Sequence, residues 1–161
     1  MNLQKGLVSL RLVEAHDLQI FFAHQLDPEA TRLAAFQSRD REAFMAHWTT
    51  NILGHPTNAC RTILCNDRVV GNIGAWTDAD TRERLLGYWL GREFWGRGIA
   101  SAAVAQFLQI ESTRPLMARV ARHNLGSLRV LEKSGFTRAG EDAFTRPDGT
   151  RVEEFIHVLA V

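Results

Sequence analysis

The sequence predicts an α/β fold in which a mixed sheet of about seven strands is flanked by four helices. Apolar residues recur with a period of two in some segments and with the helical period in others, so both strands and helices occur. The expected order is β α α β β β α β α β β, in which early strands adjoin and later strands alternate with helices. The length of 161 residues fits one domain, so we expect residues 1–161 to fold as a unit.

The first third of the chain is expected to hold one strand and two helices. Alternating apolar residues predict a half-buried strand over 7–13. Apolar residues three and four positions apart predict a helix over 17–26, which Asp27-Pro28 ends. The same spacing predicts a second helix over 40–52, which a Gly-His-Pro run closes.

The middle of the chain changes to strands before it returns to a helix. Two apolar runs within 62–76 flank a short polar turn, as in a hairpin. Another strand is expected over 85–90, followed by a glycine-bearing loop over 91–98. Apolar residues at helical spacing predict a helix from Ala100 to Glu111.

The last third is expected to alternate strands with one helix. A strand is predicted over 115–121, and Asn124 begins a helix that reaches Lys133 and is closed by Ser134-Gly135. A strand follows from Phe136, and a Pro-Asp-Gly-Thr turn separates it from a final strand over 152–161.

Composition excludes several classes of protein. Nineteen basic and eighteen acidic residues give a net charge of +1, which does not favour a nucleic-acid partner. Cys60 and Cys65 cannot form a disulfide framework and, five residues apart in a strand, should be reduced thiols on opposite faces. The histidines lack the spacing of metal ligands, so we expect no metal. Met1–Gly6 has no apolar stretch like a signal peptide, and no run could span a membrane, so a cytoplasmic protein is expected.

The loop over 91–98 carries the strongest indication of a ligand. Glycine at 96 and 98 lets the backbone approach a ligand, and the helix start behind it offers unpaired N–H groups to an anion such as phosphate. A plain strand-to-helix turn would use the same two glycines. A nucleotide-hydrolysing P-loop would need lysine and a hydroxyl where the chain has Arg97-Gly98. A dinucleotide-binding loop would need glycine in place of Ser101.

The segment 87–100 resembles the acetyl-CoA loop of the GNAT acetyltransferases, Gln/Arg-x-x-Gly-x-Gly/Ala. Gly98 and Ala100 fill the small positions, while Trp95 stands where glutamine or arginine is usual. The Tyr-Trp-Leu strand before the loop and the block 124–136 resemble the RimJ/RimL branch, which acetylates the N-termini of ribosomal proteins. That block matches Asn-x-x-Ser-x-x-x-Leu-Glu-Lys-x-Gly-Phe, and the resemblance covers nearly the whole chain.

This resemblance implies a GNAT fold with a mostly antiparallel sheet, and an enzyme that moves an acetyl group from acetyl-CoA to a primary amine. The acceptor would be a protein N-terminus or a small-molecule amine. The coenzyme's pyrophosphate would meet the backbone N–H groups of Arg97, Gly98, Ile99, Ala100 and Ser101. Its pantetheine arm would pair with Trp89, Leu90 and Gly91, one of whose amides would polarise the thioester carbonyl, and would bond to Asn124. Residues 92–138 hold eight Arg/Lys against three Glu, which suits this anionic cofactor.

The resemblance also implies catalytic roles for Ser127 and Glu83. Many relatives use a helix tyrosine to protonate the leaving thiolate, but Leu131 occupies that position, so Ser127 would face the sulfur instead. Tyr88 is the only tyrosine in the chain, and we therefore expect that acid to be missing. Glu83 would act as a base through water; its rivals are Asp78, Asp80 and His123. Positioning alone could also suffice.

Two other functions stay open at this point. The chain could bind acetyl-CoA as a sensor without turning it over, or it could transfer a longer acyl group. We expect acetyl-CoA and an amine as partners, without nucleic acid or membrane, and edge strands near the C-terminus favour a homodimer.

Overall fold

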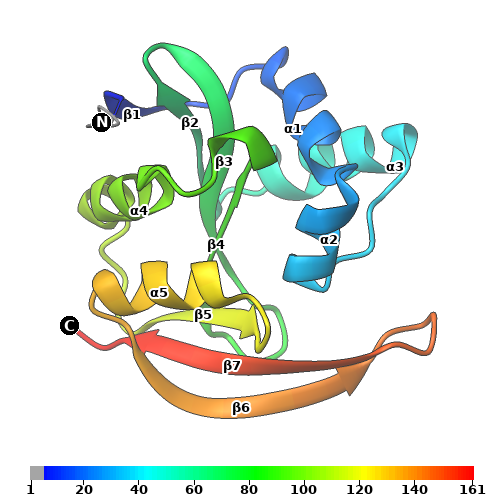
Figure 1. Cartoon of the computed structure of the whole chain (residues 1–161), viewed down its shortest axis with the longest axis vertical. Coiled ribbons are helices and arrows are strands. Elements are labelled where there is room, and N and C mark those ends of the chain that lie inside the picture. Colours follow the sequence, from blue (N-terminus) through cyan, green and yellow to red (C-terminus); the bar gives the residue numbers. More distant parts are fainter. Residues whose placement is uncertain (1–5) are drawn as a thin grey trace.

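The computed structural model of the chain describes residues 6–161. The predicted lack of a signal peptide concerns Met1–Gly6, of which Met1–Lys5 lie outside the described residues. Seven strands form one sheet in the order β1-β2-β3-β4-β5-β7-β6 (Figure 1). The strands are β1 (Val8–Arg11), β2 (Ala59–Cys65), β3 (Arg68–Thr77), β4 (Arg84–Leu90), β5 (Leu116–Ala121), β6 (Thr137–Thr145) and β7 (Arg151–Leu159). All neighbours are antiparallel except β4 and β5, which confirms the mixed, mostly antiparallel sheet.

The sheet opens between its two parallel strands. β4 and β5 pair only where Arg84 meets Leu116 and Leu85 meets Met117. Beyond these pairs the strands diverge toward their carboxyl ends (Figure 1). The rest of β4 therefore has a neighbour on one side only, β3, which leaves its other edge available to a ligand.

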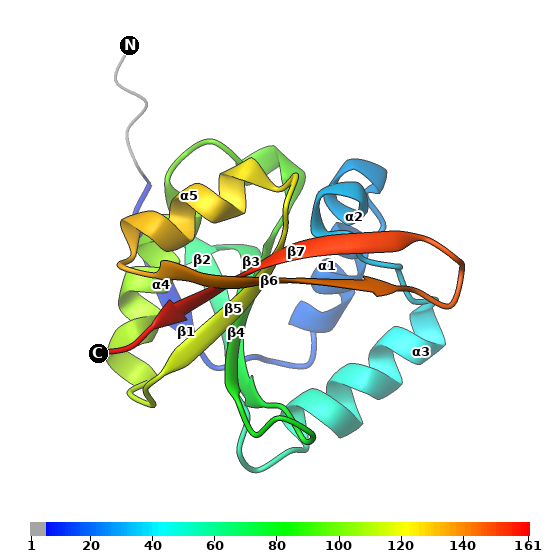
Figure 2. The same cartoon turned by 90° about the horizontal axis from the view of Figure 1, so that it is seen from below.

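Five α-helices cover the two faces of the sheet. They are α1 (Asp17–Gln25), α2 (Pro28–Ala34), α3 (Arg41–Ala46), α4 (Ile99–Ile110) and α5 (Leu125–Lys133). α4 and α5 lie on one face, and α1 to α3 lie on the other (Figure 2). Among residues 6–161, no helix has the length and apolar character needed to cross a bilayer.

The expected number of four helices was one too few, because Asp27-Pro28 both ends α1 and begins α2. Asp27 caps α2, and its Oδ2 accepts a hydrogen bond from the Ala30 amide at 3.3 Å. Pro28 takes the first helical position, where its missing N–H would have had no partner in the helix. The helix expected over 40–52 is present as α3 followed by the π-helix η1 (His47–Leu53).

The core consists of two apolar clusters, one on each face of the sheet. The larger cluster packs α4 and α5 against the sheet, and the smaller one joins Phe21 of α1 to Phe44 and Trp48. Cys65 packs against the larger cluster and Cys60 against the smaller, which confirms that the two unpaired thiols lie on opposite faces.

Asp17 fastens α1 to the edge of the sheet. Its wholly buried carboxylate accepts two hydrogen bonds from the Arg11 guanidinium, at 2.7 and 2.9 Å, and one from Thr62 Oγ1 at 2.7 Å. The backbone amide of Glu14 donates a further bond at 2.8 Å. Burial opposes the charge, but these donors outweigh it and lower the pKa of Asp17 to about 2. The network holds α1 in register with β1 and β2.

Candidate active site

A cavity of about 610 Å³ lies where β4 and β5 separate. Its walls come from α2, the end of β4, the loop that follows β4, the first turn of α4, and α5 with the loop before it. The volume is within the range of roughly 300–1,000 Å³ that is typical of sites for small molecules and cofactors. The cavity therefore combines the unpaired edge of a strand with the N-termini of two helices.

The N-terminus of α4 presents unused backbone donors to this cavity. Gly96 and Gly98 have φ angles of +74° and +76°, which favour glycine. Gly98 caps the helix without a side chain, and the first amide to bond back is that of Ala102, which donates to the Gly98 carbonyl at 3.2 Å. The amides of the first turn thus lie beside the cavity without a capping side chain.

The residues expected to bind the pyrophosphate, Arg97–Ser101, do not all line the cavity. Gly98, Ile99, Ala100 and Ser101 line the cavity. Arg97 instead lines a smaller hollow beside β1, which shares Gly98 with the cavity. Arg97 therefore lies beside Gly98 at the rim of the cavity and outside its lining.

Near the end of β4, alternate backbone amides face the gap between β4 and β5. Gly91 donates its amide to Val70 of β3 at 2.9 Å, so its N–H is used within the sheet. Because these groups alternate along an antiparallel strand, the N–H and C=O of Leu90 point the other way, toward the gap. The Leu90 carbonyl accepts from Trp95 Nε1 at 3.1 Å. Of the three residues Trp89–Gly91, Leu90 is the one whose amide faces the open edge.

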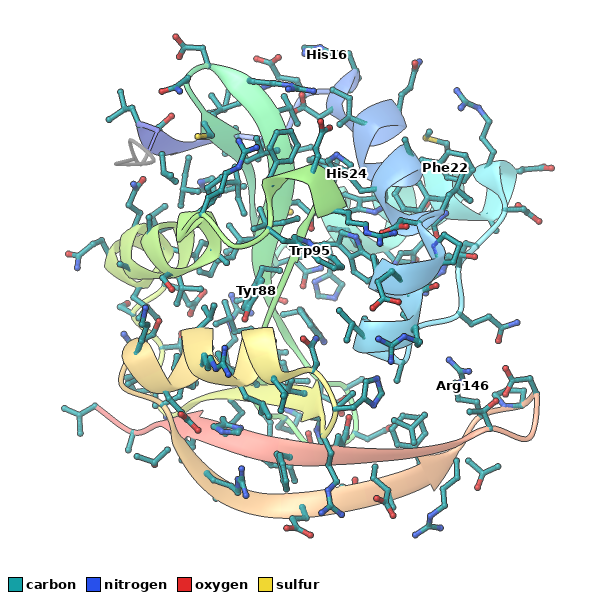
Figure 3. All side chains as sticks on the ribbon, viewed as in Figure 1. His16, Phe22, His24, Tyr88, Trp95 and Arg146 are labelled. Carbon is teal, nitrogen blue, oxygen red and sulfur yellow. The ribbon has the colours of Figure 1, made fainter. Side chains whose placement is uncertain are left out.

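Trp95, which departs from the resembled motif, has a clear structural position. It packs against the larger core cluster, lines the cavity and holds the last carbonyl of β4 through its indole N–H. Figure 3 shows it on the loop between β4 and α4. The indole therefore fixes this loop relative to the strand, a contact that the sequence did not predict.

The side chains of β4 reach both layers of the molecule. Tyr88 and Leu90 belong to the larger cluster on the α4–α5 face. Trp89 points to the opposite face, where its ring meets Phe36 in an edge contact at 5.3 Å between centroids. Since all three β4 residues line the cavity, it is open to both faces of the sheet.

The start of α5 places two polar side chains in the cavity wall. Asn124 caps the helix, with its Oδ1 accepting from the Ser127 amide at 3.3 Å. The Ser127 hydroxyl lies 2.6 Å from the hydroxyl of Tyr88, which reaches it from β4 (Figure 3). Burial raises the pKa of Tyr88 to about 12, although the bond to Ser127 acts in the other direction. The sequence did not predict this pairing, because the resembled family carries its acidic tyrosine on the helix and Tyr88 lies on a strand.

Glu83 lies at the opposite end of β4 from the α4 loop and does not line the cavity. Its Oε2 is 3.6 Å from Arg119, a residue that also contacts Asp142 and Glu154. Asp78, one of its rivals, accepts backbone hydrogen bonds from the turn that precedes β4, and these bonds lower its pKa. Asp78 therefore stabilises the turn before β4.

His123 is the rival base that does line the cavity, and it helps to fix α2 as one wall. Its Nε2 lies 2.6 Å from the Arg32 carbonyl near the end of α2. Asp27, at the start of α2, pairs with Arg92 from the β4–α4 loop at 3.3 Å. Arg146 of the β6–β7 turn donates to the Ala35 carbonyl at 2.9 Å (Figure 3). Contacts from three separate segments thus hold α2 over the cavity.

Only part of the positive charge counted in the sequence lies near the site. Arg129 and Lys133 line the cavity together with His123. Arg119 and Arg122 are paired with carboxylates, most of them on β6 and β7, and therefore add little charge there. The basic character of the cavity comes mainly from α5.

The described residues include one grouping of metal-ligand type, Glu14, His16 and Asp17. The Asp17 carboxylate already accepts from Arg11 and Thr62, so its oxygens are used in the fold. Figure 3 separates His16 from Tyr88 and Trp95 of the cavity. This grouping is therefore part of the hydrogen-bond network around Asp17 that holds α1 against the sheet.

Comparison with known proteins matches residues 8–137 to the acetyltransferase (GNAT) domain family. The uncharacterized N-acetyltransferase p20 of Bacillus licheniformis is 26% identical over 143 residues, which cover 83% of this chain and 80% of p20. Among solved structures, a T. thermophilus protein assigned as an acetyltransferase is 25% identical, with a TM-score of 0.73 and coverage of 95% and 85% of the two chains. The aminoglycoside acetyltransferase AAC(6')-Ib, solved with coenzyme A, is 17% identical, with a TM-score of 0.73 and coverage of 94% and 95%, and shows the shared fold.

Proposed function

Because the chain belongs to the acetyltransferase (GNAT) domain family, we propose that it transfers an acetyl group from acetyl-CoA to a primary amine by direct attack of the amine on the thioester. The observation that carries this proposal is the side-by-side placement of two sets of unused amides. One set is at the start of α4, and the other is the Leu90 amide on the open edge of β4. Together they suit a ligand with a phosphate end and an amide-bearing arm.

The proposed position of acetyl-CoA follows from these donors. The pyrophosphate accepts from the first-turn amides of α4, and Arg97 at the rim faces the outer phosphates. The pantetheine arm lies along the open edge of β4 and completes the pairing that β5 does not provide. The Asn124 side chain, whose oxygen caps α5, keeps its NH₂ group for a carbonyl of that arm.

The proposed chemistry takes place beside Leu90 and Ser127. The Leu90 amide donates to the thioester oxygen as negative charge develops on it in the transition state. The Ser127 hydroxyl faces the sulfur that leaves. The acceptor enters from the α2 face, where the Trp89 ring lines the cavity and packs against Phe36. We propose that Glu83, which lies outside the cavity lining and 3.6 Å from Arg119, accepts the amine proton through intervening water.

The block 124–136 supports a closer relation to the RimJ/RimL branch, and hence a protein N-terminus as the acceptor. A small-molecule amine is the second candidate. The two differ in the space they need at the α2 face, and an acceptor panel containing Ala-initiated peptides, polyamines and aminoglycosides separates them. We further propose that residues 1–161 act as one domain and that the exposed edge strand β6 pairs in a homodimer, which sedimentation measurements would detect.

Two measurements test the proposed function. Thermal unfolding with acetyl-CoA should show stabilisation that ATP and NAD do not produce at the same concentrations. Release of free CoA thiol should then depend on an amine acceptor. A chain that is stabilised by acetyl-CoA but releases no thiol with any acceptor would be a sensor, and a chain that is not stabilised would contradict the cofactor assignment. E83Q should slow turnover at the wild-type optimum pH, where the carboxylate is deprotonated, without weakening the binding of acetyl-CoA, whereas D78N is the matched surface control.

A further inference from the structure

We propose that Tyr88 supplies, through Ser127, the proton that the departing CoA thiolate takes up. The inference rests on the proposed acetyl transfer and assigns a positioning residue to it. The two hydroxyls are 2.6 Å apart, one from β4 and the other from α5, and both residues line the cavity. They meet at the point where the open edge of the strand faces the first turn of the helix.

The Ser127 hydroxyl is directed away from its own helix. Helix serines often bond to the carbonyl four residues earlier, as Ser134 does with the Val130 carbonyl at 2.8 Å. Ser127 Oγ instead has the Tyr88 hydroxyl as its partner within the described residues. Tyr88 therefore selects the orientation in which Ser127 faces the cavity.

Either hydroxyl can donate in this bond, and the Tyr88 hydroxyl also lies 3.4 Å from the Ser127 backbone carbonyl. Because a phenol is a stronger acid than an alkyl alcohol, the proposed relay takes Tyr88 as the donor and Ser127 Oγ as the acceptor. The proton of Ser127 is then left to point into the cavity. Burial raises the pKa of Tyr88 to about 12, so the phenol is protonated at neutral pH and has a proton to donate while negative charge develops on the sulfur.

Helix geometry explains why the hydroxyl beside Ser127 comes from Tyr88 on β4 and not from a residue of α5. Leu131 lies one turn after Ser127, and side chains at this spacing share a face and lean toward the helix N-terminus. Leu131 is fully buried in the larger core cluster and does not line the cavity. The hydroxyl next to Ser127 is supplied across the gap by Tyr88 instead of along the helix.

Acetyl transfer forms one bond to the acetyl carbon and breaks another. The amine nitrogen bonds to the acetyl carbon, and the carbon–sulfur bond breaks with its electron pair on sulfur. Sulfur takes the Ser127 proton, and Ser127 takes the Tyr88 proton. The proton that the amine loses passes through water to Glu83 and from there through solvent to Tyr88, so the phenol is restored. A neutral amine and acetyl-CoA thus give an amide and CoA in its thiol form.

The test measures the thiol of bound CoA and needs no acceptor. A hydroxyl that donates to sulfur favours the thiolate, so it lowers the pKa of the bound thiol. Ultraviolet thiolate absorbance followed against pH, with the protein saturated by CoA, gives this pKa. We expect Y88F and S127A each to raise it by about one unit, which is a tenfold change in the thiolate equilibrium. The double variant should equal S127A, because both changes act through one hydroxyl.

Matched controls separate this role from a structural one. S134A removes a hydroxyl that bonds within α5 and should leave the thiol pKa unchanged. His123, Arg129 and Lys133 also line the cavity and favour the thiolate, but every variant keeps them. An unchanged thiol pKa in Y88F overturns the proposal, and so does a shift in Y88F that S127A does not share. Failure of the wild type to bind CoA would instead remove the proposed function itself.

A second measurement uses the fact that Tyr88 is the only tyrosine. Protein grown with 3-fluorotyrosine carries one fluorine label, whose ¹⁹F resonance reports the surroundings of this phenol. CoA should shift the resonance, whereas dethio-CoA, which lacks the sulfur, should shift it much less. Equal shifts with both ligands would place the phenol away from the sulfur and contradict the proposal.

Discussion

Replacement of Gly98 by valine separates ligand binding from folding at the proposed phosphate site. Gly98 caps α4 with φ at +76° and lines the cavity. A β-branched residue in this left-handed conformation costs roughly 1–2 kcal/mol. In a chain of this size, that cost lowers the unfolding midpoint by roughly 2–8 °C. The isopropyl group would also stand where the backbone must approach the ligand.

The expected loss of binding follows from the stabilisation that a ligand gives. At 100 times the dissociation constant, acetyl-CoA adds about 2.7 kcal/mol to wild-type stability, which raises the midpoint by roughly 5–11 °C. A hundredfold weaker site at the same concentration adds only about 0.4 kcal/mol, or roughly 1 °C. G98V should therefore unfold somewhat earlier alone and lose nearly the whole shift with acetyl-CoA.

Gly149 provides the matched control for this experiment. It has φ at +89°, lies in the turn between β6 and β7, and has no heavy atom within 4 Å of an added Cβ. G149V should therefore carry a similar backbone cost but keep the full shift with acetyl-CoA. A full shift in G98V would refute the assignment of the α4 start as the phosphate site. Loss of the shift in both variants would show that strain anywhere, not the site, controls binding.

Three further predictions concern stability and reactivity. The pKa of Asp17 falls from 3.8 to about 2 on folding, so its charged form contributes about 2 kcal/mol to the free energy of unfolding above pH 4. This contribution is lost as the pH falls toward 2. Urea unfolding measured at a series of pH values should show the loss, and the D17N variant should not show it. Arg84 and Glu111 form a nearly buried ion pair at 2.8 Å, so R84M alone should lower the free energy of unfolding by about 3–5 kcal/mol because it leaves the Glu111 charge unpaired. The double variant R84M/E111L removes both charges and should regain most of this free energy in the same assay. Burial raises the pKa of Cys60 to about 12, so iodoacetamide should modify this thiol slowly at pH 8 in the native protein and rapidly in urea. Peptide mass spectrometry follows the modification. Fast modification of the native protein would contradict the burial of Cys60.

Hydrophobic periodicity predicted most of the fold because each strand and helix buries one face. The stripe in α4 and the alternation in β5 reflect contacts with the larger cluster, and both elements were expected within a few residues of their ends. Periodicity carries no information about which strands pair. The parting of β4 and β5, which makes the cavity, therefore had to come from the structure. α2 was missed because Asp27-Pro28 is equally typical of a helix end and of a helix start.

The site could be predicted where its chemistry depends on the backbone. Two glycines before a helix already indicate free amides, and Gly98 has the positive φ that this role favours. The side-chain contacts could not be predicted, because they join segments far apart in the sequence. His123 contacts the carbonyl of Arg32, 91 residues away, and Arg92 pairs with Asp27, 65 residues away. Such contacts depend on the packing of α2, which the sequence did not reveal.

Tyr88 shows why a missing motif residue is weak evidence for a missing group. A leaving thiolate requires a proton donor at a point in space, and a helix position is only one way to reach that point. In this chain Leu131 is committed to the core, so a tyrosine there would overpack a fully buried site at a cost of about 1–3 kcal/mol. The strand that borders the cavity already presents a phenol to the same helix turn, 2.6 Å from Ser127. Leucine on the helix and tyrosine on the strand are therefore compatible parts of one arrangement, and the absence of a helix tyrosine does not by itself favour a sensor that binds acetyl-CoA without turning it over.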